Sequence, residues 1–369
     1  MKKRDILALK TPCFVFDVDR FARNYQAFSE ALGSNGVVAY SVKTNRHNDV
    51  LRMVLRLGGM IEVVSAEEYR LVRSLGFDIK RIIYNGPLKD YHSFCEAMNG
   101  GAIVDIETWR EIEWLKDVAP RGVGLRISVN VSELSPKDAV KANDVSRFGF
   151  DDASGEVSEA IKRVTSIAGM SVVGLHLHRT TDSRRVDFYR SLAHFAVSLC
   201  SKYSLRPDYL DFGGGYHALG PGRPTPEHYV RAFNKSLIGT SLSDCHIIME
   251  PGNGLVANSF DYITEVIDAK NGHVTVDGTR NDIDPIYRRM DYKRNIVRLA
   301  TEELHIIENQ IVGGCTCMER DVLMELKNSE ALQVGDRIVF HEVGAYTLAL
   351  APSFIRRPAK VITIPSISK

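Results

Sequence analysis

The sequence predicts an α/β protein in which a (β/α)8 TIM barrel is followed by a second, mostly β domain. From residue 37 to residue 252, short apolar runs alternate with segments of helical periodicity. Such alternation requires parallel strands. Eight strand-helix units in about 215 residues suit a closed barrel better than an open sheet, although a flavodoxin-like sheet or a seven-unit fold remains the alternative. After residue 260 the pattern changes to short β-rich runs.

The barrel is expected to occupy residues 20–258. Asp19 is placed to cap a helix that ends at Leu32. The expected strands follow at residues 37–43, 60–65, 81–87, 102–107, 123–129, 172–178, 209–214 and 246–252. Between them, helical periodicity is clearest at residues 48–57, 66–75, 108–118, 155–168 and 184–203.

The second domain is expected to combine residues 1–19 with residues 259–369. Residues 13–17 form an isolated strand pattern that precedes the barrel rhythm, so we expect this strand to pair with the later β-rich segment. The other strands are expected at residues 262–267, 273–276, 304–312, 337–341 and 361–364.

Composition indicates a globular protein of enzyme size. The 369 residues are 44% hydrophobic and 25% charged, and 47 cations against 46 acids provide no basic surplus for nucleic acid. No apolar run approaches the ~20 residues of a membrane span. Six scattered cysteines without an N-terminal apolar signal segment favour reduced thiols and a cytoplasmic location. Cys315 and Cys317 lack a neighbouring ligand pair with zinc spacing, so no metal is expected.

Unusual residues fall at the carboxyl ends of the predicted strands, where barrel enzymes build their sites. Lys43 follows an apolar strand, although a strand-end lysine taken alone usually enters solvent. His178 is either a core histidine or a planar side chain that stacks on a flat ligand. Glu250 is either a structural acid paired with Arg126 or the partner of a protonatable ring nitrogen. The other polar or glycine positions at strand ends are Glu62, Ser65, Asn85, Gly86, Arg126 and His176.

Three consecutive glycines, Gly213, Gly214 and Gly215, follow the seventh predicted strand. Backbone without side chains can bring several N–H groups onto an anion such as a phosphate. A flexible turn is the alternative interpretation. No Gly-Lys-Ser/Thr follows the glycines, so the segment is not a Walker motif.

The motifs also form an ordered set along nearly the whole chain. They are TPCFVFD (11–17), YSVKTN (40–45), VSAEE (64–68), NGP (85–87), SRFG (146–149), GLHLH (174–178), LDFGGG (210–215), EPG (250–252), CMERD (317–321) and GAYT (344–347). This set resembles the pyridoxal-phosphate-dependent decarboxylases of the alanine-racemase-like fold (fold type III), which include diaminopimelate, ornithine and arginine decarboxylases.

The resemblance implies that pyridoxal 5'-phosphate is the cofactor and that the protein is a decarboxylase. By this resemblance Lys43 forms the covalent Schiff base with the cofactor, His178 stacks on its ring, and Glu250 pairs with the pyridine nitrogen. A carboxylate at that nitrogen makes the ring an electron sink. The further cofactor-binding positions implied are Glu62, Arg126, Thr181, Gly213, Gly214, Gly215, Gly252, Asn253 and Tyr346.

The resemblance also implies a homodimer with shared active sites. Cys317 is similar to the family cysteine that protonates the carbanion and that is supplied across the dimer interface to the partner's lysine site. Without the resemblance, Cys317 would be interpreted as a small, inert hydrophobic residue.

Several departures concern the substrate. Asp284 stands where diaminopimelate decarboxylases have an arginine for the distal carboxylate, and Met318 stands where they have a glutamate for the distal amine. Asn253 replaces a common arginine. These changes argue against meso-diaminopimelate and favour another amino acid or an amino-acid conjugate, for example in siderophore-like or other specialised metabolism. Candidate substrate contacts are Arg179, Arg280, Asp284, Arg288, Met318 and Glu319.

Two other functions stay open at this point. An amino-acid racemase would share the fold and the chemistry of Lys43, and would differ only in reprotonating without losing the carboxylate. A non-catalytic regulatory homologue would have lost cofactor-binding residues, whereas Lys43, Glu250 and the triple glycine are present here.

Overall fold

The computed structural model describes residues 1–288, 291–299 and 305–364. Its contacts divide the chain into two compact units. The barrel unit comprises Ala22–Lys43 and Asn48–Leu255, and the second unit comprises Met1–Phe21, Thr44–His47 and Val256–Lys369.

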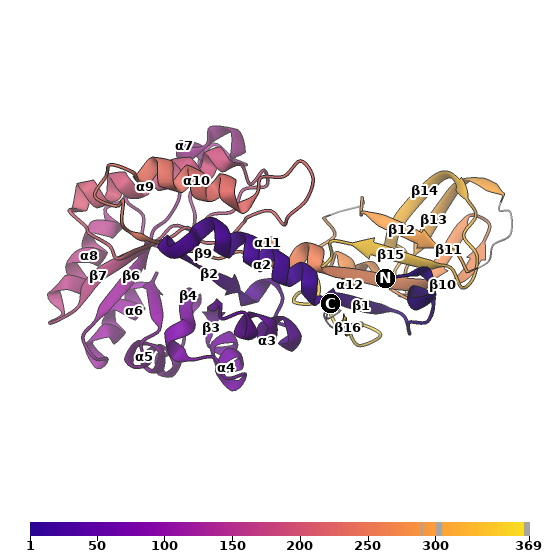
Figure 1. Cartoon of the computed structure of the whole chain (residues 1–369), viewed down its shortest axis with the longest axis horizontal. Helices are drawn as coiled ribbons and strands as arrows, with labels where there is room; N and C mark the ends of the chain where they lie inside the picture. Colours follow the sequence, from indigo (N-terminus) through magenta and orange to yellow (C-terminus); the bar gives the residue numbers. More distant parts are fainter. Residues whose placement is uncertain (289–290, 300–304, 365–369) are drawn as a thin grey trace. The chain divides into compact units, whose positions relative to one another are not determined.

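The barrel unit contains a closed parallel β-barrel, as predicted (Figure 1). Each strand pairs in parallel with the next, and β2 pairs with β9 to close the ring. The open-sheet alternative is therefore wrong. The strands are β2 (Gly36–Ser41), β3 (Met60–Ser65), β4 (Ile82–Leu88), β5 (Ile103–Ile106), β6 (Gly122–Arg126), β7 (Ser171–His176), β8 (Tyr209–Asp211) and β9 (His246–Met249).

Several predicted strands extend too far at their carboxyl ends, because the chain turns away as soon as barrel pairing stops. Lys43 lies not on β2 but in the 3-10 helix η2 that follows it. His178 and Glu250 likewise lie just beyond β7 and β9. Lys43, His178 and Glu250 thus occupy the turns after the strands.

Helices separate the barrel strands, and α5 and α10 were not among the predicted segments. The cap of α2 is Asp17 rather than Asp19, because the Asp17 carboxylate accepts the Arg20 N–H at 2.9 Å. The helices are α2 (Val18–Leu32), α3 (Asn48–Arg56), α4 (Ala66–Ser74), α5 (Tyr91–Gly100), α6 (Trp109–Trp114), α7 (Val131–Leu134), α8 (Glu156–Ser166), α9 (Val186–Tyr203), α10 (Pro226–Leu237) and α11 (Gly252–Val256). The 3-10 helices are η1 (Gly33–Asn35), η2 (Val42–Thr44), η3 (Ile79–Arg81), η4 (Leu115–Asp117), η5 (Pro136–Asp138) and η6 (Ala257–Ser259).

The second unit is mostly β, as predicted. Its sheet runs β12-β15-β10-β11-β13-β14, and the N-terminal strand β1 (Cys13–Asp17) joins it by pairing antiparallel with β10 and parallel with β16. The predicted strand at 304–312 is observed from Ile306, and residue 304 lies outside the described residues. The elements of this unit are α1 (Lys3–Leu7), β10 (Phe260–Lys270), β11 (His273–Val276), α12 (Arg280–Ile283), β12 (Arg294–Val297), β13 (Ile306–Gly313), β14 (Val322–Glu330), β15 (Arg337–His341) and β16 (Lys360–Ile364). In the described part of the chain, no helix has the length and apolar character needed to cross a membrane.

The barrel interior contains a buried acid next to a buried tyrosine. The Tyr209 hydroxyl donates to Asp105 Oδ1 at 2.7 Å. Room for this pair comes from two glycines, since a Cβ at Gly124 would lie 1.7 Å from Asp105 Oδ1 and one at Gly174 would lie 2.0 Å from the Tyr209 ring. Burial is the main cause that raises the pKa of Asp105 to about 6.

Asp105→Asn should therefore remove part of the pH dependence of stability. With a folded pKa of about 6, against about 4 in the unfolded chain, folded Asp105 binds more protons than unfolded Asp105 between these values. The free energy of unfolding of the wild type then falls as pH rises through this window. Urea unfolding at pH 4, 5.5 and 7 should show the variant gaining up to about 3 kcal/mol relative to wild type.

Asp187→Asn, at an exposed acid on α9, is the matched control and should track the wild type. An Asp105→Asn curve parallel to the wild-type curve from pH 4 to pH 7 would show that folding does not raise the pKa of Asp105.

Candidate active site

A cavity of about 410 Å³ opens within the barrel unit. Its walls are turns that follow barrel strands, together with residues at the strand ends, and this is the rim where the sequence places its unusual residues. The lining residues are Lys43, Glu62, Val64, Asn85, Gly86, Pro87, Arg126, Ser146, Phe148, His176, His178, Arg179, Thr180 and Glu250.

Lys43 is held inside this cavity by a carboxylate. Its Nζ lies 2.9 Å from Oε1 and 2.8 Å from Oε2 of Glu62. Glu62 is 1% exposed, and the Ser41 hydroxyl donates to its Oε2 at 2.5 Å. The amino group is therefore fixed at the cavity wall by the Glu62 carboxylate.

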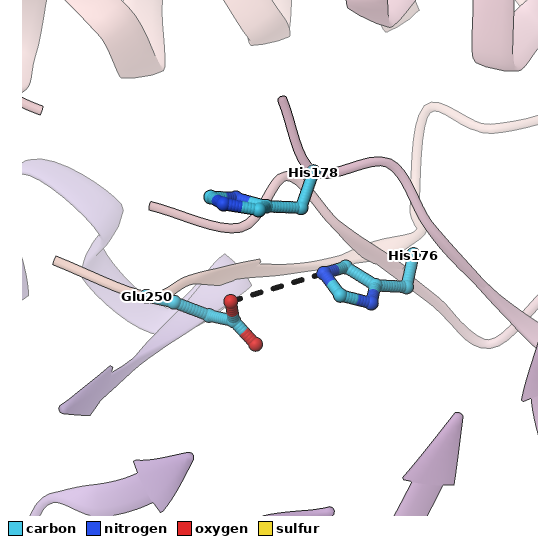
Figure 2. A group of neighbouring side chains, drawn as sticks. All are labelled: His176, His178 and Glu250. Carbon is cyan, nitrogen blue, oxygen red and sulfur yellow. Dashed lines mark ion pairs between the residues drawn. The ribbon is translucent and has the colours of Figure 1, made fainter. Parts of the chain in front are cut away.

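Glu250 follows β9 and is fully buried. Asn85 Nδ2 donates to its Oε1 at 2.6 Å, and His176 Nε2 lies 3.8 Å from its Oε2 (Figure 2). Burial raises the pKa of Glu250 well above its usual range. The negative charges of Asp211 and Glu62 raise this pKa further.

Arg126 does not pair with Glu250. Its guanidinium donates to Glu107 Oε2 at 2.8 Å and lies 4.7 Å from the Phe148 ring centroid. The interpretation of Glu250 as a structural acid paired with Arg126 is therefore wrong, because a different buried carboxylate takes the arginine.

His178 lies against the glycine run. The Gly214 N–H donates to His178 Nδ1 at 2.9 Å, so in the neutral ring the proton is on Nε2. A Cβ at Gly213, which has φ +60°, would lie 2.2 Å from the same nitrogen. Burial and the charges of Lys43 and Arg126 lower the pKa of His178 well below its usual value. The site thus presents an uncharged planar ring, and only glycine leaves space for it.

His176, His178 and Glu250 converge from the ends of β7 and β9, as Figure 2 shows. Their potential ligand atoms lie within 4.8 Å of one another, which raises the question of a metal. His178 argues against this, because Nδ1 accepts a hydrogen bond and Nε2 then carries the proton. Neither nitrogen offers a lone pair to an ion in that state.

The remaining predicted residues of the barrel unit have local partners. Thr181 accepts the Arg184 N–H at 3.2 Å within a turn, and its neighbour Thr180 lines the cavity instead. Asn253 Nδ2 donates to the Tyr216 carbonyl at 3.3 Å. Gly252 begins α11. A Cβ at Gly215 would lie 2.8 Å from the Thr180 hydroxyl, so the glycine run touches the lining through Thr180 as well as His178.

Three candidate residues from the sequence, Tyr346, Cys317 and Arg280, belong to the second unit. Tyr346 is 42% exposed, has φ 58° and donates its N–H to the Thr44 carbonyl at 2.9 Å. Cys317 is exposed. Arg280 Nη2 pairs with Asp284 Oδ2 at 3.0 Å, and both side chains are buried.

The other candidate substrate contacts of the second unit are near Cys317 and Asp284 in the sequence. Met318 is half-buried, whereas Glu319 and Arg288 are exposed.

The cavity brings together Lys43, Glu62, Arg126, His178, Arg179 and Glu250 from the predicted site. Sequence reasoning found His176 and Asn85 at strand ends but assigned them no role, and it missed Thr180. A signal for His176 was present. Side chains two residues apart in an extended segment share a face, so an inward His178 implies an inward His176.

These features define a parallel-barrel enzyme site for a flat, anionic ligand. The cavity volume lies in the ordinary range for small-molecule sites. Lys43 and Arg126 line the cavity, each paired with a carboxylate, and the glycine run leaves room for close approach. Among the described residues, neither ring nitrogen of His176 has a hydrogen-bond partner although the side chain is buried. The donor set fits pyridoxal phosphate, which has a ring, a phosphate and a carbonyl that reacts with a lysine.

Comparison with known proteins identifies the family. Residues 18–257, more than half of the chain, match the model for the pyridoxal binding domain of pyridoxal-dependent decarboxylases. The chain therefore belongs to the pyridoxal-dependent decarboxylase family, an enzyme family of lyases whose cofactor is pyridoxal phosphate.

Among curated relatives, the chain is 29% identical over 371 residues to the diaminopimelate decarboxylase of Actinosynnema pretiosum subsp. auranticum, covering 95% of this chain and 83% of that protein. It is 26% identical to a probable chloroplastic diaminopimelate decarboxylase of Oryza sativa subsp. japonica, with coverages of 94% and 73%.

Solved structures share the fold. The diaminopimelate decarboxylase of Methanocaldococcus jannaschii superposes with a TM-score of 0.85 at 21% identity, covering 99% of this chain and 89% of that one. The arginine decarboxylase of Paramecium bursaria Chlorella virus gives 0.83 at 20% identity, with coverages of 98% and 99%.

Lys43→Ala should abolish the covalent attachment of the cofactor. Wild-type protein incubated with pyridoxal phosphate should be yellow, and borohydride reduction should fix the cofactor to the peptide that contains Lys43, because this amino group lines the cavity. Lys116→Ala, at an exposed lysine of the same unit, is the matched control and should label like wild type. Cofactor fixed to Lys43→Ala protein at wild-type stoichiometry would rule out Lys43 as the attachment point.

Proposed function

We propose that the protein is a pyridoxal-phosphate-dependent carboxy-lyase acting on an amino acid or amino-acid-derived conjugate other than meso-diaminopimelate, in siderophore or other specialised metabolism. The observation that carries the reaction class is the pairing of Lys43 with Glu62 in a cavity that also contains the buried Glu250. A nucleophilic amine and a carboxylate for the ring nitrogen are the two groups that this chemistry requires.

In this proposal each residue has a defined task. When bound, the cofactor supplies an electron sink for the charge left when the α-carboxylate leaves as carbon dioxide. Glu62 accepts the proton that Lys43 must lose to become a nucleophile, since its two oxygens already contact Nζ. Glu250, whose Oε1 accepts a hydrogen bond from Asn85 at 2.6 Å, takes the proton of the ring nitrogen. The neutral ring of His178 provides a flat surface.

Anion binding is assigned to the backbone of Gly213, Gly214 and Gly215, with the Tyr346 hydroxyl as a further donor. The steric crowding at Gly213 supports this assignment, since a side chain there would displace His178. Arg126 contributes positive charge to the cavity while Glu107 fixes its guanidinium. Thr181, Gly252 and Asn253 are kept as outer contacts of the cofactor.

The charges on candidate substrate residues support a substrate other than meso-diaminopimelate, although the names of the curated relatives favour that compound. Arg280 is occupied by Asp284 at 3.0 Å and lies 4.4 Å from the Tyr287 ring. Arg179 Nη2 forms an ion pair with Asp144 Oδ1 at 2.6 Å. The distal end of the substrate is therefore assigned to the exposed Arg288 and Glu319, beside Met318.

The proposal also includes a homodimer that shares its active sites. Residues 20–258 form the cofactor-binding barrel, and residues 1–19 with 259–369 bring Cys317 to the partner's Lys43 site. The exposure of Cys317 supports this role, because a proton donor for another subunit must be accessible. All six cysteines are free thiols, which agrees with a cytoplasmic location.

Carbon dioxide release across an amino-acid panel tests the substrate. The panel should contain diaminopimelate, lysine, ornithine, arginine and their N-acylated conjugates, each with cofactor-loaded protein. We expect kcat/KM for the preferred compound to exceed that for meso-diaminopimelate at least about tenfold, because one missing charge partner costs about 1.4 kcal/mol or more. Fastest release from meso-diaminopimelate would refute the substrate proposal, and inversion without carbon dioxide on a chiral column would identify a racemase.

Mixing two inactive variants tests the shared site. Lys43→Ala and Cys317→Ala homodimers should each be strongly impaired, whereas a subunit-exchanged mixture should regain about a quarter of wild-type activity, because one site in each mixed dimer is intact. Cys315→Ala, two residues from Cys317 in the same loop, is the matched control and should stay active. No recovery after exchange demonstrated by native mass spectrometry would place both groups in one chain.

A further inference from the structure

One oxygen of Glu250 accepts a short hydrogen bond from Asn85, and the other lies near His176 but beyond hydrogen-bond distance of it. Asn85 Nδ2 donates to Oε1 at 2.6 Å, whereas His176 Nε2 stands 3.8 Å from Oε2 (Figure 2). His176 is 2% exposed, and in the described part of the chain neither of its ring nitrogens has a hydrogen-bond partner. A buried imidazole with no hydrogen bond is costly, so a partner is expected in the working state.

We infer that His176 is a positioning residue that acts through Glu250 by donating its Nε2–H to Oε2, so that the carboxylate is held at both oxygens when the cofactor binds. This inference rests on the proposed function, in which Glu250 holds the proton of the ring nitrogen. A side-chain shift of about 1 Å shortens the 3.8 Å separation to a hydrogen bond.

The surroundings of His176 keep its ring neutral. Burial is the main cause that lowers the pKa of His176 well below its usual value, and the positive charges of Arg126, Lys43 and Lys89 act in the same direction. A neutral imidazole carries one N–H and one lone pair. The ring therefore adds a donor beside Glu250 without adding a charge. The ionisable groups around it are Arg126 and Asp211 in register on β6 and β8, Glu250 after β9, His178 after β7, and Lys43 and Lys89.

Glu250 needs a second donor because its surroundings favour the protonated form. Burial is the main cause that raises its pKa. The negative charges of Asp211 and Glu62 and a side-chain hydrogen bond with Asp211 raise this pKa further, whereas the positive charge of Lys43 lowers it. A protonated Glu250 cannot accept the ring nitrogen's proton, whereas hydrogen bonds to the carboxylate favour the ionised form. Asn85 supplies one such bond, and His176 is in position to supply the other.

Three substitutions separate this role from simple packing. His176→Gln keeps a donor near the position of Nε2, His176→Asn keeps an amide that is too short to reach Glu250, and His176→Phe keeps the flat ring without a donor. His246→Phe is the matched control, because His246 is an exposed histidine at the start of β9.

The readouts are the dissociation constant of pyridoxal phosphate, from titration of apoprotein, and the pH profile of the bound cofactor's visible absorbance. We expect the dissociation constant to rise about tenfold or more in His176→Asn and His176→Phe, and to change less than about threefold in His176→Gln and His246→Phe. The absorbance transition of the cofactor ring should move to lower pH in the two variants without a suitable donor, since Glu250 then stabilises the ring proton less well.

The outcomes distinguish this inference from the proposed function. Wild-type apoprotein that takes up no cofactor refutes the proposed function itself. Wild-type uptake with equal affinities and equal pH profiles for the Gln and Asn variants refutes the role of His176. Should His176→Phe fail to fold by circular dichroism, the Gln and Asn pair still decides, since both keep a polar side chain.

Discussion

The site depends on one electrostatic constraint, the burial of Glu250 inside a closed barrel. An isolated carboxylate removed from water is destabilised unless it is paired or protonated. Here burial and two neighbouring acids raise its pKa, and the neutral Asn85 donates a hydrogen bond to it. The fold therefore maintains an acid whose charge becomes favourable when a cation arrives. The protonated ring nitrogen of the family's cofactor is such a cation.

Other charged residues of the barrel unit pair with one another and leave Glu250 without a cationic partner among these pairs. Four buried or half-buried cations of the barrel unit each lie within 3.1 Å of a separate acid. The pairs are Lys43 with Glu62, Lys89 with Glu111, Arg126 with Glu107 and Arg179 with Asp144. Because each cation has its own partner, Glu250 can respond to the ligand instead of being neutralised by the protein. Lys89 also donates to the Gly86 carbonyl at 2.7 Å, which fixes the end of β4 next to Asn85.

The barrel and the residues at its rim could be predicted from the sequence, because both follow from the periodicity of apolar residues. Alternating strands and helices imply parallel strands, and parallel strands end at one edge. The pairing of charges was not predictable in the same way. Asp144 reaches Arg179 from a segment 35 residues away. Glu107 lies beside Arg126 because it follows β5, the neighbour of β6 in the barrel, but the sequence alone does not show that the two side chains meet. Whether Thr180 or Thr181 lines the cavity depends likewise on the path of one turn.

The same contrast explains why the chemistry is easier to infer than the substrate. Most residues that line the cavity lie on barrel strands or shortly after them, so the register of the barrel fixes their neighbours. Candidate substrate residues sit on short segments such as α12, where Arg280 folds back onto Asp284 four residues later. Because Asp284 neutralises Arg280, the charge of this arginine does not indicate which charge the substrate carries. Substrate choice in this chain therefore has to be sought in the side chains that such segments leave exposed, Arg288 and Glu319 among them.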